Sequence, residues 1–481
     1  MLYREQGRRA GHSYYHVGDG FHYKIERVSA NDNCAYFTCK STLCSGRALF
    51  RADGYFEHTQ PHNHAPDLLY NEVQAARRQI LDRTRTVTYA SFADILATER
   101  SRIRSRLIRS QLTLRRLRPA MLRVRREAFP NLPRNLAGLT TTLQDPAWDW
   151  LTKTKDSQDR MYLGSTWAAD GSHNVIFISR RCLQIMRMVS IIFADGTFYI
   201  SPSVEGCYQV FTIVTISENT VIPLCWCLME RKTEHAYIAV LMIIRQHLGN
   251  WRFNRVITDF EDAMINAFRA VFQVEVQGCY FHSANAMGQH ARVTIGVQLL
   301  HIFPDISCVV RLCCSLPLLP QHLIQRGFNL IAVTAMENIN AFLFICIVVP
   351  YLEYIQHDWL HHANRGQTLS VCGSEHRTNN ASESNNRRMK RSFGVHHPNI
   401  YHFIRKLADF EDAAVDDIFS LGGGNLPNRH RDVRSISNDA HIAAITRELL
   451  QTNNPSDVQI LRFLTMASVT VADLLDVLLE Q

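Results

Sequence analysis

The sequence predicts a multidomain protein of mixed α/β class, and three observations lead to that prediction. The chain has 481 residues, 46% of them hydrophobic and 20% charged. This composition suits about three globular domains and excludes a mostly disordered or fibrous chain. Residues 1–70 combine Cys, His and aromatic side chains in short alternating runs, as small β-hairpins do. From Leu183 onward, strand-like and helix-like segments alternate, which is typical of an α/β fold.

The N-terminal region, residues 1–70, contains a pattern of metal-ligand residue types. Two cysteines and two histidines follow C-x4-C and H-x-H spacing: Cys39, Cys44, His62 and His64. Zinc prefers four nitrogen and sulfur ligands, and a module with so small a core gains its stability from the metal. The spacing alone leaves open the alternative of loop histidines and buried free thiols.

Arginines dominate residues 71–128, which are predicted to be helical, with an amphipathic stretch from Thr98 to Arg126. The net charge of the chain is only +8, but 15 arginines and three acidic residues lie between Arg77 and Arg126. Because arginine pairs with phosphates, this block favours a nucleic-acid partner. The alternative is a solvated helix face. The arginines expected to contact DNA here are Arg102, Arg104, Arg106, Arg115 and Arg116.

The segment 129–182 carries three prolines, at 130, 133 and 146, and is predicted to be a linker. Beyond it, apolar runs predict strands over 188–194, 210–216, 221–227, 255–258 and 274–281, with helices over 236–248 and 264–272 between them. Residues 288–372 lack this alternation and are predicted to be mainly helical. Further helices are expected from Asn380 and after Pro398.

Two acidic residues stand where predicted strands end. Asp195 follows the first strand and Asp259 follows a later one. Functional side chains converge at strand ends in α/β sheets, and paired carboxylates there can hold the two divalent ions that cleave a phosphodiester. Magnesium suits such a site. The alternatives are that Asp195 belongs to a turn with Gly196 and that Asp259 lies incidentally in a capping box.

Other signals bear on location. The first residues, MLYREQGRRAGHSYY, lack the apolar core of a secretory signal, and 13 scattered cysteines argue against a disulfide framework. The most apolar segment, Ala341 to Leu352, is too short to span a bilayer and contains Pro350. We therefore expect a soluble protein of a reducing compartment that does not enter a membrane.

Two family resemblances extend these predictions. The stretches NCAYFTCKSTLCSGRALF and GYFEHTQPHNHAPD resemble a FLYWCH-type zinc finger, with Phe37 where that family commonly has Trp. This resemblance implies that all four Cys and His residues named above bind zinc. From about Leu183 to Leu407, the stretches FADGTFYISP, VITDFEDAMINAF and GCYFHSANAMGQH resemble the transposase domain of Mutator-like elements (MULE).

The MULE resemblance implies an RNase H-like core with an Asp-Asp-Glu triad that binds Mg²⁺ or Mn²⁺. Asp195 and Asp259 match the first two acids, and His282 belongs to a matching Cys279-x2-His pair. The stretch RTNNASESNN places the third acid at Glu383, although Glu375 lies nearby and Asn380 to Glu383 could be only a capping box. Arg388 and Lys390 follow on the same helix and face DNA phosphates if that helix lies beside the site.

Together these predictions divide the chain into seven parts. They are a FLYWCH-type zinc finger (1–70), an Arg-rich DNA-binding region (71–128), a linker (129–182), a first core part (183–287), a helical insertion (288–372), a last core helix (373–410) and a helical tail (411–481).

The implied function is a nuclear DNA transposase that binds double-stranded DNA, assembles as a homo-oligomer on it, and cleaves and transfers strands. Asp195, Asp259, Glu383 and His282 are its expected catalytic residues. A first alternative is a catalytically silent DNA-binding regulator derived from a transposase. It is favoured by the absence of cysteines after Cys372, where many relatives have a further zinc finger. A second alternative is a zinc-stabilised protein-interaction module.

Overall fold

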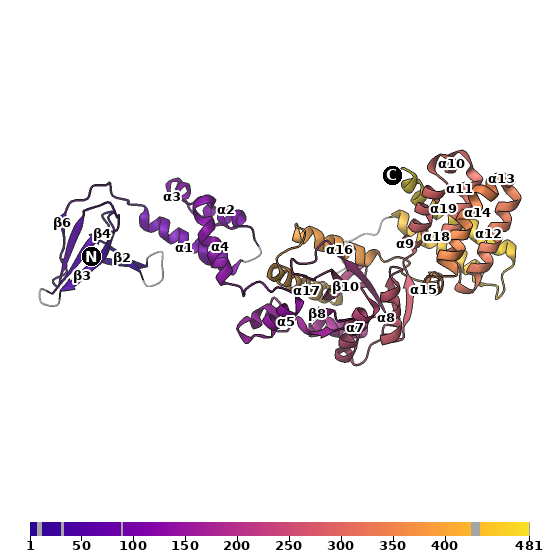
Figure 1. Ribbon diagram of the computed structural model, residues 1–481, viewed down its shortest axis with the longest axis horizontal. Coiled ribbons are helices and arrows are strands. Elements are labelled where there is room, and N and C mark those ends of the chain that lie inside the picture. The colour runs from indigo at the N-terminus through magenta and orange to yellow at the C-terminus, as the bar shows by residue number, and fades with distance from the viewer. Residues whose placement is uncertain (7–11, 30–32, 88–89, 425–432, 481) are drawn as a thin grey trace. The chain divides into compact units, whose positions relative to one another are not determined.

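The computed structural model describes residues 1–6, 12–29, 33–87, 90–424 and 433–480 (Figure 1). The chain divides into two compact units, Met1–Asn131 and Leu132–Gln481. The described residues contain two β-sheets and many helices. The predicted mixed α/β, multidomain class is therefore confirmed.

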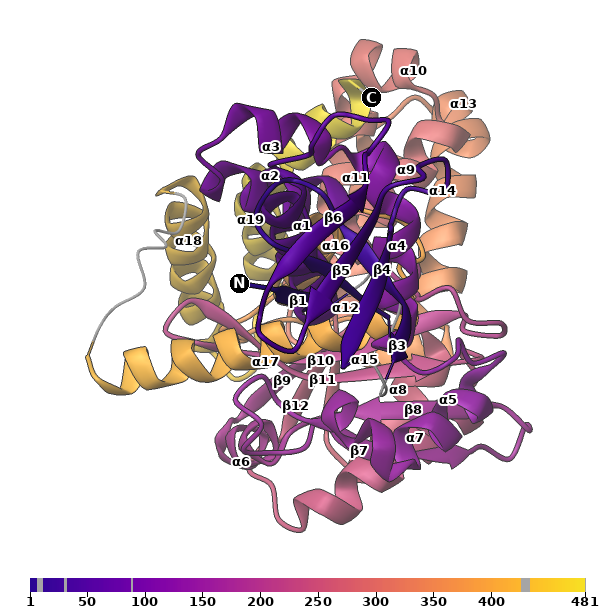
Figure 2. The same cartoon turned by 90° about the vertical axis from the view of Figure 1, so that its left-hand side faces the viewer.

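The first unit begins with a six-stranded antiparallel sheet whose strands follow one another in chain order (Figure 2). The strands are β1 (Tyr3–Gln6), β2 (Ser13–His16), β3 (Tyr23–Ser29), β4 (Cys34–Cys39), β5 (Arg47–Arg51) and β6 (Phe56–Gln60). A turn at Asp53-Gly54 joins β5 to β6, with Gly54 at a φ of 86°. The buried centre is small and consists of Tyr23, Phe37 and Ala48.

The rest of this unit is a bundle of four helices. They are α1 (Tyr70–Thr86), α2 (Phe92–Arg102), α3 (Arg106–Gln111) and α4 (Leu114–Glu127). Ile80, Leu117 and Met121 lie in their shared core. The Arg-rich stretch is divided among three helices because Ser105 starts α3 by accepting a hydrogen bond from the Ile108 amide.

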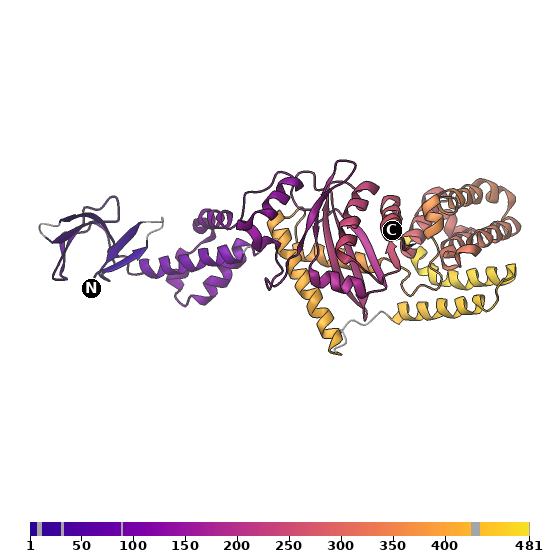
Figure 3. The same ribbon diagram turned by 90° about the horizontal axis from the view of Figure 1, so that it is seen from below.

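The second unit is built on a seven-stranded mixed sheet of order β13-β12-β9-β10-β11-β8-β7 (Figure 3). The strands are β7 (Tyr162–Trp167), β8 (His173–Phe177), β9 (Ile191–Thr197), β10 (Gln209–Ser217), β11 (Thr220–Met229), β12 (Arg255–Thr258) and β13 (Glu275–Gly278). β9 pairs antiparallel with β10 and parallel with β12, so β9 and β12 end at the same edge.

Helices lie on both sides of this sheet (Figure 3). They are α5 (Leu136–Gln144), η1 (Pro146–Thr152), α6 (Arg180–Met188), α7 (Glu234–Leu248), α8 (Asp262–Phe272), α16 (Asn380–Phe393) and α17 (Ile400–Gly422). Phe211 and Phe268 belong to the large core that includes α7 and α8. Phe193 and Ile257 pack instead with Ala381 of α16, which brings α16 beside β9 and β12.

The linker predicted over 129–182 differs from the structure, because this segment contains α5, η1, β7 and β8. One of the three prolines that suggested a linker starts a helix: Pro146 occupies the first turn of η1, where a missing N–H costs nothing, whereas Pro130 and Pro133 lie in the loop between α4 and α5. β8 is buried along its whole length and pairs with β11. The sheet therefore extends N-terminal to the predicted boundary at Leu183.

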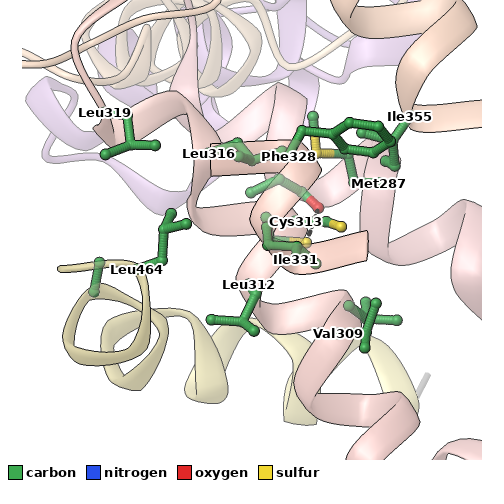
Figure 4. Packing of buried hydrophobic residues seen from close by; sticks show 14 of the residues in the cluster. Met287, Val309, Leu312, Cys313, Leu316, Leu319, Phe328, Ile331, Ile355 and Leu464 are labelled. Atoms are coloured by element: carbon green, nitrogen blue, oxygen red, sulfur yellow. Dashed lines mark hydrogen bonds between the residues drawn. The ribbon is translucent and has the colours of Figure 1, made fainter. Parts of the chain in front are cut away.

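The remaining helices form a separate bundle. They are α9 (Tyr280–Thr294), α10 (Val297–Ile302), α11 (Pro304–Ser315), η2 (Leu316–Leu318), η3 (Gln321–Leu323), α12 (Ile324–Asn338), α13 (Ala341–Leu343), η4 (Phe344–Val348), α14 (Val349–Tyr354), η5 (Ile355–Leu360), α15 (Ala363–Thr368), α18 (Val433–Leu450) and α19 (Asp457–Glu480). The predicted tail, 411–481, differs from the structure because its last helices belong to this bundle. Leu464 of α19 joins the core that contains Leu312 of α11 and Phe328 of α12 (Figure 4).

Candidate functional site

Asp195 lies on β9, an interior strand of the sheet, near its carboxyl end and beside α16. The buried run before it, Ile192 to Ala194, fixes the strand in the core. Its Oδ1 accepts a hydrogen bond from the Gly196 amide at 2.7 Å, and its Oδ2 accepts one from Asn386 Nδ2 at 2.6 Å. Burial and the neighbouring charge of Asp259 raise the pKa of Asp195 to about 7.

Asp259 directly follows β12 and is held by two other elements. Asn379, at the start of α16, donates from Nδ2 to Asp259 Oδ1 at 3.1 Å and also to the Ala194 carbonyl at 3.2 Å. One carboxamide thus joins the ends of β9 and β12. His282 Nδ1, from α9, lies 3.0 Å from the same Asp259 oxygen.

Glu383 stands in the first turn of α16. Its Oε1 lies 3.7 Å from His282 Nε2, so the imidazole of His282 stands between Glu383 and Asp259. Contacts with Asp259 and Cys279 raise the pKa of His282 to about 11, and the ring is a cation at neutral pH. About a third of each of these three side chains is exposed, which leaves the cluster open to solvent.

The structure therefore brings together Asp195, Asp259, His282 and Glu383, although 188 positions separate the first from the last. Cys279 is fully buried and its Sγ accepts a hydrogen bond from the Asn379 amide at 3.1 Å. Glu375, the alternative third acid, is exposed and lines a cavity with Leu318 and Asp439 in the helical bundle.

Two residues that the sequence reasoning did not single out support the acids. Asn379 and Asn386 each orient one aspartate, and the Oδ1 atoms of both are buried without a hydrogen-bond partner among the described residues. The sequence feature that could have identified both residues is the Asn-rich stretch around Glu383. Asn386 lies three residues after Glu383, and this spacing places both on one helix face.

The three carboxylates are chemically suited to a divalent cation, because oxygens are the hard ligands that Mg²⁺ prefers. The charges of Asp195 and Asp259 repel each other, and a cation between the two carboxylates would remove that repulsion. Among the described residues of this cluster, the ligand atoms that all lie within 4.8 Å of one another are those of Asp259, Cys279 and His282.

A second group of ligand atoms lies in the first unit. Cys39, Cys44, His62 and His64 present one atom each within 4.8 Å of one another. Cys39 Sγ lies 3.3 Å from His64 Nε2, and Cys44 Sγ lies 3.3 Å from His62 Nδ1. Tetrahedral zinc with its usual bond lengths would separate sulfur and nitrogen by about 3.5 Å. The four residues therefore fit a metal ion of this kind.

The remaining nitrogens of both histidines are fixed by neighbours, as in metal sites. His64 Nδ1 lies 2.9 Å from the Ala65 carbonyl. His62 Nε2 lies 2.8 Å from the hydroxyl of Tyr23, whose ring is fully buried. That hydroxyl also lies 2.7 Å from His58 Nδ1. Burial holds the pKa of His62 below its ordinary value, which favours the neutral ring that binds metals.

The predicted DNA-contacting arginines of the first unit are all exposed: Arg102, Arg104, Arg106, Arg115 and Arg116. Arg102 also pairs with the buried carboxylate of Glu99 at 2.8 Å. Arg125 serves the fold instead, because its guanidinium donates to two backbone carbonyls and covers the ring of Phe92.

On α16, the two predicted DNA-contacting residues lie in different surroundings. The Arg388 guanidinium lies over the Phe410 ring of α17, 5.3 Å from its centroid. Lys390 Nζ lies over Tyr199, 4.1 Å from the ring centroid, and Lys390 is exposed. Only Lys390 therefore stands beside the segment that follows Asp195.

Comparison with known proteins identifies one family. Residues 191–286 match the model of the MULE transposase domain, and this span contains Asp195, Asp259 and His282. No curated protein matches the chain. The family match supports a transposase-related function, with DNA as the partner and divalent metal use. In the described part of the chain, no helix combines the length and the apolar content needed to cross a membrane.

Proposed function

We propose, from the transposase domain at 191–286 and the acid cluster that Asp195 and Asp259 of this span form with Glu383, that this chain is a DNA transposase of the Mutator-like class. In this proposal it cleaves DNA at element ends and transfers the cut strands in a metal-dependent reaction. The observation that carries the proposal is the meeting of Asp195, Asp259 and Glu383 around His282, from elements separated by a whole helical bundle.

In this proposal Asp195, Asp259 and Glu383 hold Mg²⁺ or Mn²⁺. These ions, when bound, activate the attacking oxygen and stabilise the leaving oxygen of a phosphodiester. Asn386 and Asn379 orient the two aspartates through their carboxamide donors. His282 carries a proton at neutral pH and holds Asp259. Water attacks first, and the resulting 3′-hydroxyl attacks the target strand.

The first unit supplies DNA binding in this proposal. Zinc held by the two cysteines and two histidines stabilises a sheet with a very small core. The exposed arginines of α2 to α4 neutralise phosphates. A nuclear location and an assembly of several copies on DNA follow from the same function.

The second candidate is a DNA-binding regulator without catalysis, and one observation favours it. The unit Met1–Asn131 has its own core and holds the metal-ligand group and most of the predicted DNA contacts. DNA binding is therefore separable from the acids.

The deciding experiment compares nicking with binding in the full chain. Asp195→Asn, Asp259→Asn and Glu383→Gln should each abolish Mg²⁺-dependent nicking of supercoiled DNA. The matched control Glu375→Gln, an exposed acid eight residues before Glu383, should nick normally. DNA affinity measured without added Mg²⁺ or Mn²⁺ should be equal in all four variants. A wild-type chain that binds DNA but never nicks it, with either Mg²⁺ or Mn²⁺, would establish the regulator instead.

A further inference from the structure

Aromatic side chains open to solvent begin three residues beyond Asp195. Phe198 is 44% exposed and Tyr208 is 50% exposed. Their rings contact each other edge to face, with centroids 5.1 Å apart. They stand at the two ends of the loop between β9 and β10, so the pair presents an apolar surface next to the acid cluster.

A third ring of the same loop, Tyr199, is flanked by positive and polarisable groups. Lys390 Nζ lies 4.1 Å from its centroid, and the His396 ring centroid lies 3.4 Å away. Lys390 follows Asn386 by one helical turn, and Asn386 follows Glu383 by nearly one turn. Since residues at this spacing share a helix face, one face of α16 runs from the acids to the aromatic loop.

Hydrogen bonds to the segment between α16 and α17 hold this loop in place. The Ser203 amide donates to the Pro398 carbonyl at 2.9 Å, and His397 Nδ1 lies 3.0 Å from the Ser201 carbonyl. The loop after β9 and the loop between α16 and α17 therefore form one joined rim. A surface ordered before binding loses little conformational entropy when a ligand arrives.

The positive charge beside these rings comes from Lys390 of α16. Residues 198–208 contain Glu205 and no Arg or Lys, and Arg388 of α16 lies over Phe410 instead. Positive charge suits phosphates, and exposed aromatic rings suit base faces. Paired bases hide their faces inside the duplex, so a base can stack on protein only when it is unpaired.

We propose that Phe198 and Tyr208, with Lys390 beside Tyr199 of the same loop, form a stacking platform for an unpaired nucleotide next to the scissile phosphate. This inference rests on the proposed function, since it assumes that Asp195 and Glu383 face DNA. It specifies the substrate as DNA whose strands are separated next to the cleavage point. Lys390 holds the flanking phosphate and the rings hold the base.

The test measures binding without cleavage. The full chain, in buffer without added Mg²⁺ or Mn²⁺, is titrated against a duplex that carries a three-nucleotide unpaired flank with 2-aminopurine, and against the same duplex fully paired. The readouts are the ratio of the two dissociation constants and the quenching of 2-aminopurine fluorescence. Wild-type protein should prefer the unpaired flank and quench the probe.

The double variant Phe198→Ala/Tyr208→Ala should lose this preference by roughly tenfold, because stacking of one base contributes about that much. Tyr208→Phe keeps the ring and should retain the preference. The control Phe419→Ala removes an aromatic side chain that is 75% exposed on α17 and should change nothing. All replaced side chains are exposed, so the variants leave the core intact.

Two results would overturn the platform: equal affinity of the wild-type chain for both DNAs, or an unchanged preference in the double variant. Because the assay needs no chemistry, it separates the two proposals. A chain that never nicks DNA, yet loses its preference in the double variant, retains the platform and contradicts the transposase activity.

Discussion

Replacing Asp195 by Asn should stabilise the metal-free protein, and this stabilisation should grow as pH rises. Burial and the charge of Asp259 raise the pKa of Asp195 from its ordinary 3.8 to about 7. An acid with a raised pKa in the folded state binds its proton more tightly there than in the unfolded chain. The stability associated with that proton is complete below pH 3.8 and is lost as pH rises to 7.

The magnitude follows from the same values. A rise from 3.8 to about 7 corresponds to about 4 kcal/mol in full. Only the part of this change between pH 5 and about pH 7 falls within an experiment from pH 5 to pH 8, so we expect roughly 2–3 kcal/mol. In a unit of this size, that amounts to a difference in Tm of roughly 3–5 °C.

The assay can be confined to the relevant unit without cutting the chain. All six tryptophans lie after Asn131, so the thermal transition of tryptophan fluorescence reports the second unit. The difference in Tm between Asp195→Asn and wild type should widen from pH 5 to pH 8 in EDTA. His282 is present in both proteins, so its own titration cancels in this difference.

Adding Mg²⁺ should raise the Tm of the wild-type protein above that of Asp195→Asn. The ion stabilises the wild-type protein, which holds it with two aspartates, and does little for the variant. Glu375→Gln, which removes an exposed acid away from the cluster, should melt like wild type at every pH. A Tm difference that is constant from pH 5 to pH 8, together with equal effects of Mg²⁺ on both proteins, would refute the reasoning.

Two further predictions concern the first unit. Tyr23→Phe removes the hydroxyl that orients His62 and should lower zinc affinity by roughly 10–100-fold in a chelator competition; Tyr15→Phe is the control, and equal affinity of both variants would contradict this role. Replacing three exposed arginines by Ala should reduce the slope of log Kd against log salt by about 0.9 per lost phosphate contact, whereas an unchanged slope would identify a solvated face. The three are Arg102, Arg104 and Arg106.

The sequence predicted best those parts of the fold that depend on long apolar runs. β9 to β12 are buried and nearly continuous in hydrophobic residues, and they were expected within a few positions. β7 was missed because its side chains are mostly half-buried and Gly164 interrupts it. β8 was missed because prolines before it suggested a linker. Proline occurs at helix starts as well as in loops, so prolines alone do not identify a linker. The pairing of β8 with β11 shows that this segment belongs to the sheet.

The acids of the site were predictable from their place near the carboxyl ends of strands, and the supporting amides were less so. Asp259 directly follows β12, whereas β9 continues two residues past Asp195; both positions lie near the carboxyl ends of parallel strands, which favours function. Asn379 and Asn386 act through the orientation of their carboxamides toward those acids. No periodicity encodes that orientation, because it depends on α16 packing beside β9 after the helical bundle has formed.

The helical bundle is closed by helices that are far from it in sequence. Leu464 and Phe463 of α19 join a core whose other members lie mostly between 284 and 371. In a nascent chain, that core stays open until α19 has been synthesised, and contacts of such long sequence separation form slowly. During this interval the apolar surface around Leu312 is available for aggregation or for a chaperone. α16, which carries Glu383, packs on the sheet beside β9, so the consequence of the late emergence of α19 falls on the bundle itself.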